Sequence, residues 1–248
     1  MAKQSGLLKV TGTIDGINYY YLNGKPVARK AGGGFNSKAI KTATNMRRVR
    51  ENAAEFGHCS SVNKAFRGAI RGFYHGRPFR QMHQRLMSLF NALKNLDTES
   101  KRGERKVLKG VLSNDGLKQM TSFIFTPMCE PRETLLFDYS LNSIDFVLSL
   151  RYMGTVMGKI PNTATHLRLC YGLLDFNFSA LEYQLYTAEC ELIAITDVDI
   201  EYVFKPEVGI LSGVALPILG VEFLSYQAGM CVSYSSEKSV GFCILEQR

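Results

Sequence analysis

The sequence predicts an α+β protein with an N-terminal β-meander, a basic helical hairpin and a C-terminal antiparallel β-sandwich of Greek-key type. Three observations predict it: two hairpin-turn dipeptides near the N-terminus, apolar residues at helical spacing between residues 46 and 96, and period-two patterns after residue 122. The 248 residues, 46% of them hydrophobic, suffice for one large or two small domains. We expect three regions, at residues 1–34, 35–110 and 111–248.

The N-terminal region contains the signals of three short strands. Asp15-Gly16 and Asn23-Gly24 are typical of two-residue hairpin turns, because both dipeptides tolerate positive φ angles. The tyrosine-rich strand Ile17–Leu22 lies between them. Pro26 lacks an N–H, so the strand at residues 25–30 is predicted to lie at a sheet edge. Because three strands alone are marginally stable, we expect the meander to pack on its own chain or on a neighbouring copy.

The glycine-rich stretch Ala31–Gly34 is predicted to be a flexible linker. It lacks the Lys and Ser or Thr that follow the last glycine of a P-loop. The G-x-G-x-x-G pattern of dinucleotide-binding turns is also missing. The stretch therefore does not indicate a phosphate site.

Two helices are predicted next. Apolar residues recur every three or four positions from Met46 to Phe73 and again from Met82 to Leu96, and Gly57 marks a kink or a break in the first helix. Cations occupy the remaining sides. They form either a solvated face or a polyanion surface. The candidate polyanion-binding residues are Arg47, Arg48, Arg50, Lys64, Arg67 and Arg71.

The C-terminal region shows the alternation of half-buried strands. From residue 166 to residue 171, Leu167, Leu169 and Tyr171 alternate with His166, Arg168 and Cys170. The apolar residues of Ile144–Leu150 also recur at every second position. Asn114–Gly116 indicates a turn. About eight short strands with turn signals between them favour a β-sandwich. Further strands are predicted at residues 134–139, 181–190, 192–204, 220–227, 229–234 and 240–244.

The charge is distributed unevenly along the chain. Residues 1–110 hold 22 Lys and Arg against 6 Asp and Glu, a net charge of +16. Residues 111–248 hold 8 against 16, a net charge of −8. A basic first half is typical of proteins that bind nucleic acid or another polyanion. The reversal equally indicates attraction between the halves, within one chain or between copies.

No catalytic pattern is found among the titratable residues. None of the four histidines lies in an H-E-x-x-H motif or beside a matched carboxylate, and there is no G-x-S-x-G elbow. We therefore expect no enzymatic activity, no cofactor and no metal ion. The four histidines are His58, His75, His83 and His166.

Two smaller groups leave alternatives open. Asp197, Asp199 and Glu201 fall at period two, which predicts one strand face that is either solvated or a calcium site. Tyr74 and Phe79 lie among the basic residues and are the aromatic candidates for stacking on nucleic-acid bases.

The six cysteines include no C-x-x-C pair. We expect buried thiols in a reducing compartment, with a disulfide between C-terminal strands as the alternative. The apolar run Val208–Val221 is too short and too interrupted to span a bilayer, and the first residues lack an apolar leader. The expected location is the cytoplasm or an assembled particle, without membrane contact.

The run from Leu8 to Lys30, together with Asn45–Gly57 and Ala65–Arg67, resembles a group of uncharacterised proteins common in the Bacteroidota. In that group a hairpin leads into helices and a β-sandwich follows. The resemblance is clearest over about the first seventy residues. It implies an architecture and no catalytic residues.

The expected function is that of a non-enzymatic structural or assembly protein whose partners are other copies of itself, in a filament, shell or virion-like particle. The candidate self-assembly residues are Tyr19, Tyr20, Tyr21 and Val27. The first alternative is nucleic-acid binding through the basic helices. A ligand-binding sandwich has only the fold class in its favour.

Overall fold

The structure, a computed structural model, describes residues 2–4, 9–32, 37–74, 79, 81–158, 160–227 and 229–246. It divides into two compact units, Met1–Ala54 and Glu55–Arg248, with the boundary inside helix α2 (Arg47–Ala69). This division differs from the three regions expected from the sequence, because the helices after residue 54 share a core with the C-terminal sheets. The predicted α+β class is confirmed.

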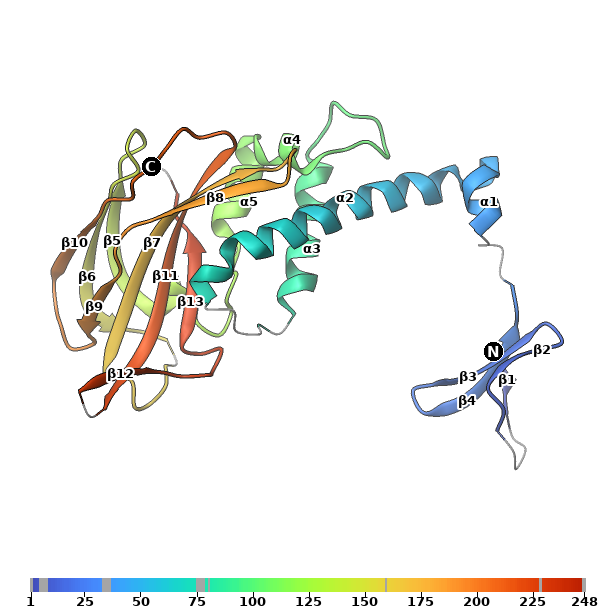
Figure 1. Cartoon of the computed structure of the whole chain (residues 1–248), viewed down its shortest axis with the longest axis horizontal. Helices are drawn as coiled ribbons and strands as arrows, with labels where there is room; N and C mark the ends of the chain where they lie inside the picture. Colours follow the sequence, from blue (N-terminus) through green and yellow to red (C-terminus); the bar gives the residue numbers. More distant parts are fainter. Residues whose placement is uncertain are drawn as a thin grey trace. The chain divides into compact units, whose positions relative to one another are not determined.

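The N-terminal unit contains a four-stranded antiparallel sheet in the order β1-β4-β3-β2 (Figure 1). Both predicted hairpin turns are present, with φ of 47° at Asp15 and 51° at Asn23. The prediction that the strand containing Pro26 is an edge was wrong. A two-residue strand covers its outer side, and there the Pro26 carbonyl accepts a bond from the Gln4 N–H at 3.2 Å. The strands are β1 (Ala2–Lys3), β2 (Gly12–Ile14), β3 (Ile17–Leu22) and β4 (Lys25–Lys30).

Two short helical segments, α1 (Ser37–Thr42) and the 3₁₀ turn η1 (Thr44–Met46), lead into α2. The Arg50 guanidinium joins them, because it donates to the carbonyls of Ile40 at 2.7 Å and Ala43 at 3.0 Å. Leu8, with which the resembling run begins, and Gly33 and Gly34 of the predicted linker lie outside the described residues.

Gly57 was predicted to mark a kink or a break, and α2 continues through it without a break. Its buried face begins at Glu55 and continues with Cys59, Val62 and Phe66, whereas Phe56, predicted to be on that face, is exposed. A 3₁₀ segment, η2 (Ile70–Tyr74), follows. Helix α3 (Met82–Asn95) buries the predicted face, with Leu86, Phe90 and Leu93 fully enclosed. Among the described residues, no helix combines the length and apolarity needed to cross a membrane.

Three short helices follow: α4 (Val107–Val111), α5 (Asn114–Ser122) and α6 (Pro131–Thr134). The turn predicted at Asn114–Gly116 was wrong, because these residues begin α5. The Ser113 hydroxyl caps that helix by accepting the Gly116 N–H at 3.0 Å. A Cβ atom at 116 would lie 1.9 Å from the Gly110 carbonyl oxygen, so this glycine permits close packing and does not form a turn.

The C-terminal strands form two antiparallel sheets (Figure 1). One has three strands in the order β10-β6-β5. The other has six, with β7 and β11 at its centre. β8 and β9 share the outer edge of β7, and β12 and β13 share the outer edge of β11. The strands are β5 (Leu135–Leu141), β6 (Leu148–Val156), β7 (His166–Asn177), β8 (Glu182–Thr187), β9 (Glu191–Ala194), β10 (Ile200–Phe204), β11 (Val214–Gln227), β12 (Met230–Ser233) and β13 (Val240–Ile244).

The two central strands of the six-stranded sheet, β7 and β11, are buried on both faces over most of their length. On one face Leu174, Phe176 and Ile218 pack against the helices. On the other, Leu169 and Phe223 pack with residues of the three-stranded sheet. The second unit therefore has three layers, and both central strands carry nearly continuous apolar runs, as strands covered on both faces do.

Two strand predictions in this region were wrong. Ile144 is 90% exposed and lies in the turn between β5 and β6, where the Asn142 N–H donates to the Val147 carbonyl at 3.0 Å. The expected strand at residues 192–204 is two strands. β9 pairs with β7 and β10 pairs with β6, so the chain changes sheets between them.

Phe73 of η2 fills a place where the six-stranded sheet has no side chains. A Cβ atom at Gly220 would lie 2.8 Å from its Cδ1 atom, and one at Gly172 would lie 3.1 Å from its Cζ atom. The ring thus contacts the backbones of both central strands.

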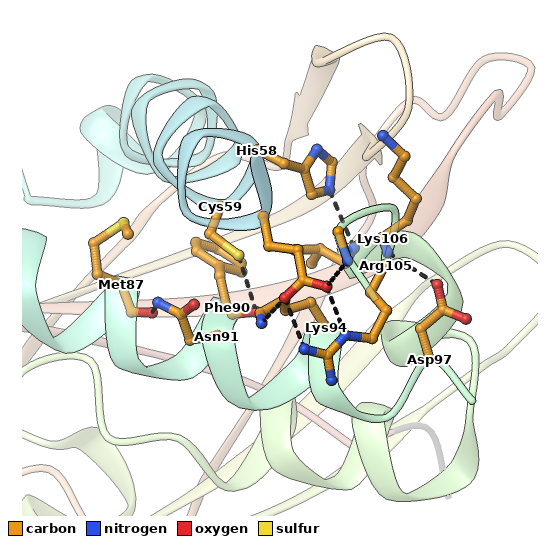
Figure 2. A network of polar contacts seen from close by, with 12 residues as sticks. His58, Cys59, Met87, Phe90, Asn91, Lys94, Asp97, Arg105 and Lys106 are labelled. Atoms are coloured by element: carbon orange, nitrogen blue, oxygen red, sulfur yellow. Dashed lines mark hydrogen bonds and ion pairs between the residues drawn. The ribbon is translucent and has the colours of Figure 1, made fainter. Parts of the chain in front are cut away.

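The helical layer is held together by a buried carboxylate, that of Glu55. Its partners Lys94 and Arg105 are labelled in Figure 2. Oε1 accepts from the Gly103 N–H and Arg105 Nε, both at 2.7 Å. Oε2 accepts from Lys94 Nζ at 2.5 Å and from an Arg105 terminal nitrogen at 2.7 Å. Nearby, Asp97 accepts the N–H groups of Ser100 and Lys106, both at 2.9 Å. These contacts fix the irregular segment 97–106 against α2 and α3.

These bonds favour the ionised carboxylates. The Arg105 guanidinium, hydrogen-bonded to Glu55, holds the pKa of that carboxyl well below its usual range in spite of burial. Burial alone would raise the pKa of Asp97, but the N–H groups of Lys106 and Ser100 outweigh it and lower this pKa to about 2.

We predict that replacing Glu55 by Gln destabilises the protein by about 3–5 kcal/mol at pH 7, because the Lys94 ammonium stays buried without a counter-charge. A carboxyl group whose pKa is lower in the folded state stabilises the fold at pH values above its pKa in the unfolded chain, which is about 4.3 for Glu. This stability is lost as the pH falls below that value. The Glu55→Gln variant should therefore lose less stability between about pH 5 and pH 2 than the wild type. Urea unfolding at several pH values measures both effects.

The control is Glu104→Gln, which changes an exposed carboxylate on the same segment and should leave the unfolding curves unchanged. Equal loss of stability in acid by the Glu55→Gln variant and the wild type would contradict the claim that the ionised Glu55 carboxylate stabilises the fold.

Candidate interaction surfaces

The strand register of the N-terminal sheet gathers most of its apolar side chains on one face. Ile14 pairs with Ile17, Tyr19 with Ala28, and Tyr21 with Pro26. Directly paired residues point to the same side of a sheet, so these six residues form one surface, which we call the apolar sheet face. Ile14, Ile17 and Tyr21 expose between 38% and 51% of their surface.

The opposite face is partly covered within the unit, around Tyr20 and Val27. Val27 is the one buried residue that the structure describes between residues 1 and 54. Its strand neighbour Tyr20 lies under the Arg29 guanidinium, 5.5 Å from the ring centroid. The Gln4 side chain donates to the Val27 carbonyl at 3.1 Å. The predicted self-assembly residues are thus divided: Tyr19 and Tyr21 are on the apolar sheet face, and Tyr20 and Val27 are on the other.

Four of the six candidate polyanion-binding residues already have partners. Arg47 and Arg48 both bind the Glu51 carboxylate, at 2.8 and 2.9 Å. Arg50 donates to two carbonyls, as described above. Arg67 donates to the Asn63 side chain at 3.1 Å. Lys64 and Arg71 are exposed and have no partner among the described residues.

Tyr74 and Phe79, the candidate stacking residues, pack on the core. Their rings meet edge to face with centroids 5.6 Å apart, and Tyr74 also stacks on Phe242 at 6.2 Å. The Tyr74 hydroxyl donates to the Arg67 carbonyl at 3.3 Å. Neither ring is a free platform for a nucleic-acid base.

Among the residues that the structure describes, the histidines and carboxylates do not converge on a reaction centre. His58 Nε2 accepts the Val107 N–H at 3.1 Å, and burial lowers the pKa of His58. The neighbouring Glu55 accepts four donors, which is the capacity of a carboxylate, so it has no acceptor site left for a substrate. His83 and His166 lie on separate elements, and His75 is outside the described residues.

The predicted strand face with Asp197, Asp199 and Glu201 was wrong. Asp197 lies in a turn and accepts the Ala194 N–H at 3.0 Å, and Asp199 pairs with Arg151. Only Glu201 belongs to β10. Within the described residues, no group of His, Cys, Asp and Glu is arranged to bind a metal ion.

Two of the six cysteines are not the expected thiols and follow the alternative, a disulfide in the C-terminal region. Cys170 of β7 forms a disulfide with Cys190, which precedes β9. Four cysteines are free, and only Cys231 among them is partly exposed. Burial raises the pKa of Cys59 to about 11 and that of Cys129 to about 12, and it raises the pKa of Cys243 further. The sequence could not identify this pair, because strand pairing brings it together.

A groove that the sequence did not reveal lies where β11 extends past the end of β13. The last pair of that ladder is Ile218 with Ile244, and the Leu245 N–H then donates to the Pro217 carbonyl at 2.8 Å. Residues 214–216 of β11 therefore have no neighbouring strand on that side among the described residues. Alternate residues of a strand point their N–H and C=O groups to the same edge. The Pro217 carbonyl points to this edge, so the N–H and C=O groups of Ala215, two residues earlier, also point toward the groove.

The groove, which we call the β11–α5 groove, has a volume of about 520 Å³ and is mostly apolar. Leu117 of α5 and the preceding Leu112 line the groove, and both are exposed. The segment Val214–Pro217 and Phe146 also line it. Glu246 lies at one end, where its N–H donates to the Tyr139 hydroxyl at 3.1 Å.

We predict that a thiol reagent labels the native protein at one position, Cys231, because burial and raised pKa values keep the other three thiols unreactive. Denaturation without a reductant should expose four thiols, and reduction should expose six. Mass spectrometry counts the labels. Six labels before reduction would show that the Cys170–Cys190 bond is not formed in solution.

Comparison with protein-family models, with curated proteins and with solved structures found no match to this chain.

Proposed function

We propose that this protein is a non-enzymatic assembly protein whose copies contact one another through the N-terminal sheet, in a filament, shell or virion-like particle. The apolar sheet face is the observation that carries the proposal. A sheet with one buried described residue has little core of its own, yet it exposes Ile14, Ile17 and Tyr21 side by side. Clustered exposed apolar residues are typical of protein interaction sites.

The charge distribution supports a second copy as the partner. The N-terminal unit holds 10 Lys and Arg against 2 Asp and Glu, a net charge of +8. Residues 111–248 carry −8. Contact between these regions of different copies brings unlike charges together. Such a contact joins two different surfaces, so it forms a ring or continues into a filament.

The disulfide supports an assembled particle as the location in preference to the cytoplasm. Disulfides persist in oxidising environments, including virion and cell surfaces, and are rare where thiol systems keep cysteines reduced. Cys170 and Cys190 form such a bond here.

We predict that replacing Ile17 by Asp weakens self-association at least tenfold. Burying one isoleucine side chain contributes about 1.5–3 kcal/mol, and a carboxylate in the contact adds a desolvation cost. Light scattering after size-exclusion chromatography, over a hundredfold range of concentration, measures the effect.

The matched control is Leu22→Asp, which places the same charge on the same strand but on the opposite face. Its exposure, 42%, is close to the 38% of Ile17. Loss of assembly in both variants to the same extent, or a wild-type protein that is monomeric at every concentration, would contradict the proposal.

The alternative that we propose is nucleic-acid binding, which the two unpartnered cations Lys64 and Arg71 support. With about two phosphate contacts, the affinity would fall with salt at a logarithmic slope of about −2 and would ignore base sequence. In that case Lys64→Glu/Arg71→Glu removes binding to a random duplex, and Lys238→Glu retains it. Filter binding at several salt concentrations tests this, and equal retention by both variants would exclude these residues.

A further inference from the structure

We propose that the β11–α5 groove is the surface that receives the N-terminal sheet of a second copy. This inference rests on the proposed assembly function and names the acceptor side of the contact. The donor is the apolar sheet face, together with its edge strand β2.

The shape and chemistry of the groove suit an extended, apolar occupant. Its lining includes the exposed Leu112 and Leu117 and the start of β11. There the N–H and C=O groups of Ala215 point toward the groove. An extended segment can satisfy them by adding a strand, as peptides do at exposed sheet edges. An apolar helix could fill the same volume, but it would leave this pair of polar groups without partners.

The N-terminal sheet supplies such an edge. β2 is the outermost strand on one side of the sheet, and all three of its residues are exposed. Ile14 of β2 belongs to the apolar sheet face, so an edge that pairs beside β11 brings this face next to the two leucines. Tyr19 and Tyr21 would extend the contact, since tyrosine combines a large apolar surface with a polar tip.

The charges at the two surfaces are complementary. The N-terminal sheet and its connections contain five cations, against the single carboxylate of Asp15. At the groove, Glu246 and Lys118 are among the lining residues. Asp115 directly follows the lining residue Asn114, and Asp145 directly precedes the lining residue Phe146. Both carboxylates are exposed. Three acidic groups against one lysine favour a basic partner.

The test is the variant Leu112→Asp/Leu117→Asp in the full-length chain. Both leucines are exposed, so the fold should be retained, and an unchanged melting temperature verifies this. We expect at least a tenfold weaker self-association by light scattering. The control is Leu192→Asp/Ile210→Asp. It makes the same changes at exposed positions outside the groove, one of them on β9, across β7 from β11. The control should assemble like the wild type.

Mixing two variants gives a sharper readout. The Ile17→Asp chain keeps its groove, and the Leu112→Asp/Leu117→Asp chain keeps its sheet. If the sheet of one copy enters the groove of the next, each variant alone is monomeric. The mixture then forms a 1:1 dimer that cannot grow, because the dimer has only a defective sheet and a defective groove left.

The outcomes separate this inference from the proposed function. Assembly that is lost with Ile17→Asp but kept with Leu112→Asp/Leu117→Asp would overturn the groove as the acceptor and leave the assembly function standing. A wild-type protein that stays monomeric at all concentrations would overturn both. A mixture that forms no dimer, with both variants folded, would also overturn the assignment of the groove.

Discussion

The pairing of β7 with β11 is the interaction on which the second unit depends. Eleven residues of each strand are in register, from Val214 opposite Phe176 to Leu224 opposite His166. Both strands are buried on both faces, so they divide the apolar residues into one core with the helices and another with the three-stranded sheet. The shorter strands each cover part of an outer edge. The β11–α5 groove exists because the ladder with β13 stops at the pair Ile218–Ile244 and leaves the first residues of β11 uncovered.

Several cations of the helical region bind groups inside the fold. The net charge counted from the sequence therefore differs from the charge that the surface presents. Lys94 and Arg105 neutralise Glu55 inside the helical layer. Arg85 donates to the carbonyls of Ile124 and Phe125. A guanidinium that satisfies carbonyls inside the fold is not available to a phosphate. The excess of positive charge in the first half therefore overstates the basic surface that the chain presents.

The sequence predicts the local features well and the long-range ones poorly. The turns at Asp15 and Asn23 and the buried face of α3 depend on neighbouring residues, and all three are confirmed. The break between β9 and β10 and the Cys170–Cys190 bond depend on strand pairing over long distances, which periodicity does not contain. The candidate surfaces follow the same rule. The tyrosine run is visible in the sequence, but its division between two faces requires the register, and the groove requires the relative ends of two strands.

The contact of Phe73 with Gly172 and Gly220 has a consequence for evolution. An aromatic ring lying on two backbones leaves little room for a Cβ atom at Gly172 or Gly220, so the three positions are coupled. Homologues that keep this fold should carry small residues at both strand positions wherever position 73 is an aromatic ring. Where the ring is lost, position 220 can enlarge, whereas position 172 stays restricted by the Tyr186 carbonyl oxygen, which would lie 3.0 Å from a Cβ atom there. This triplet joins segments about 100 and 150 residues apart, so it offers a signature by which distant members of the lineage can be recognised after overall identity has faded.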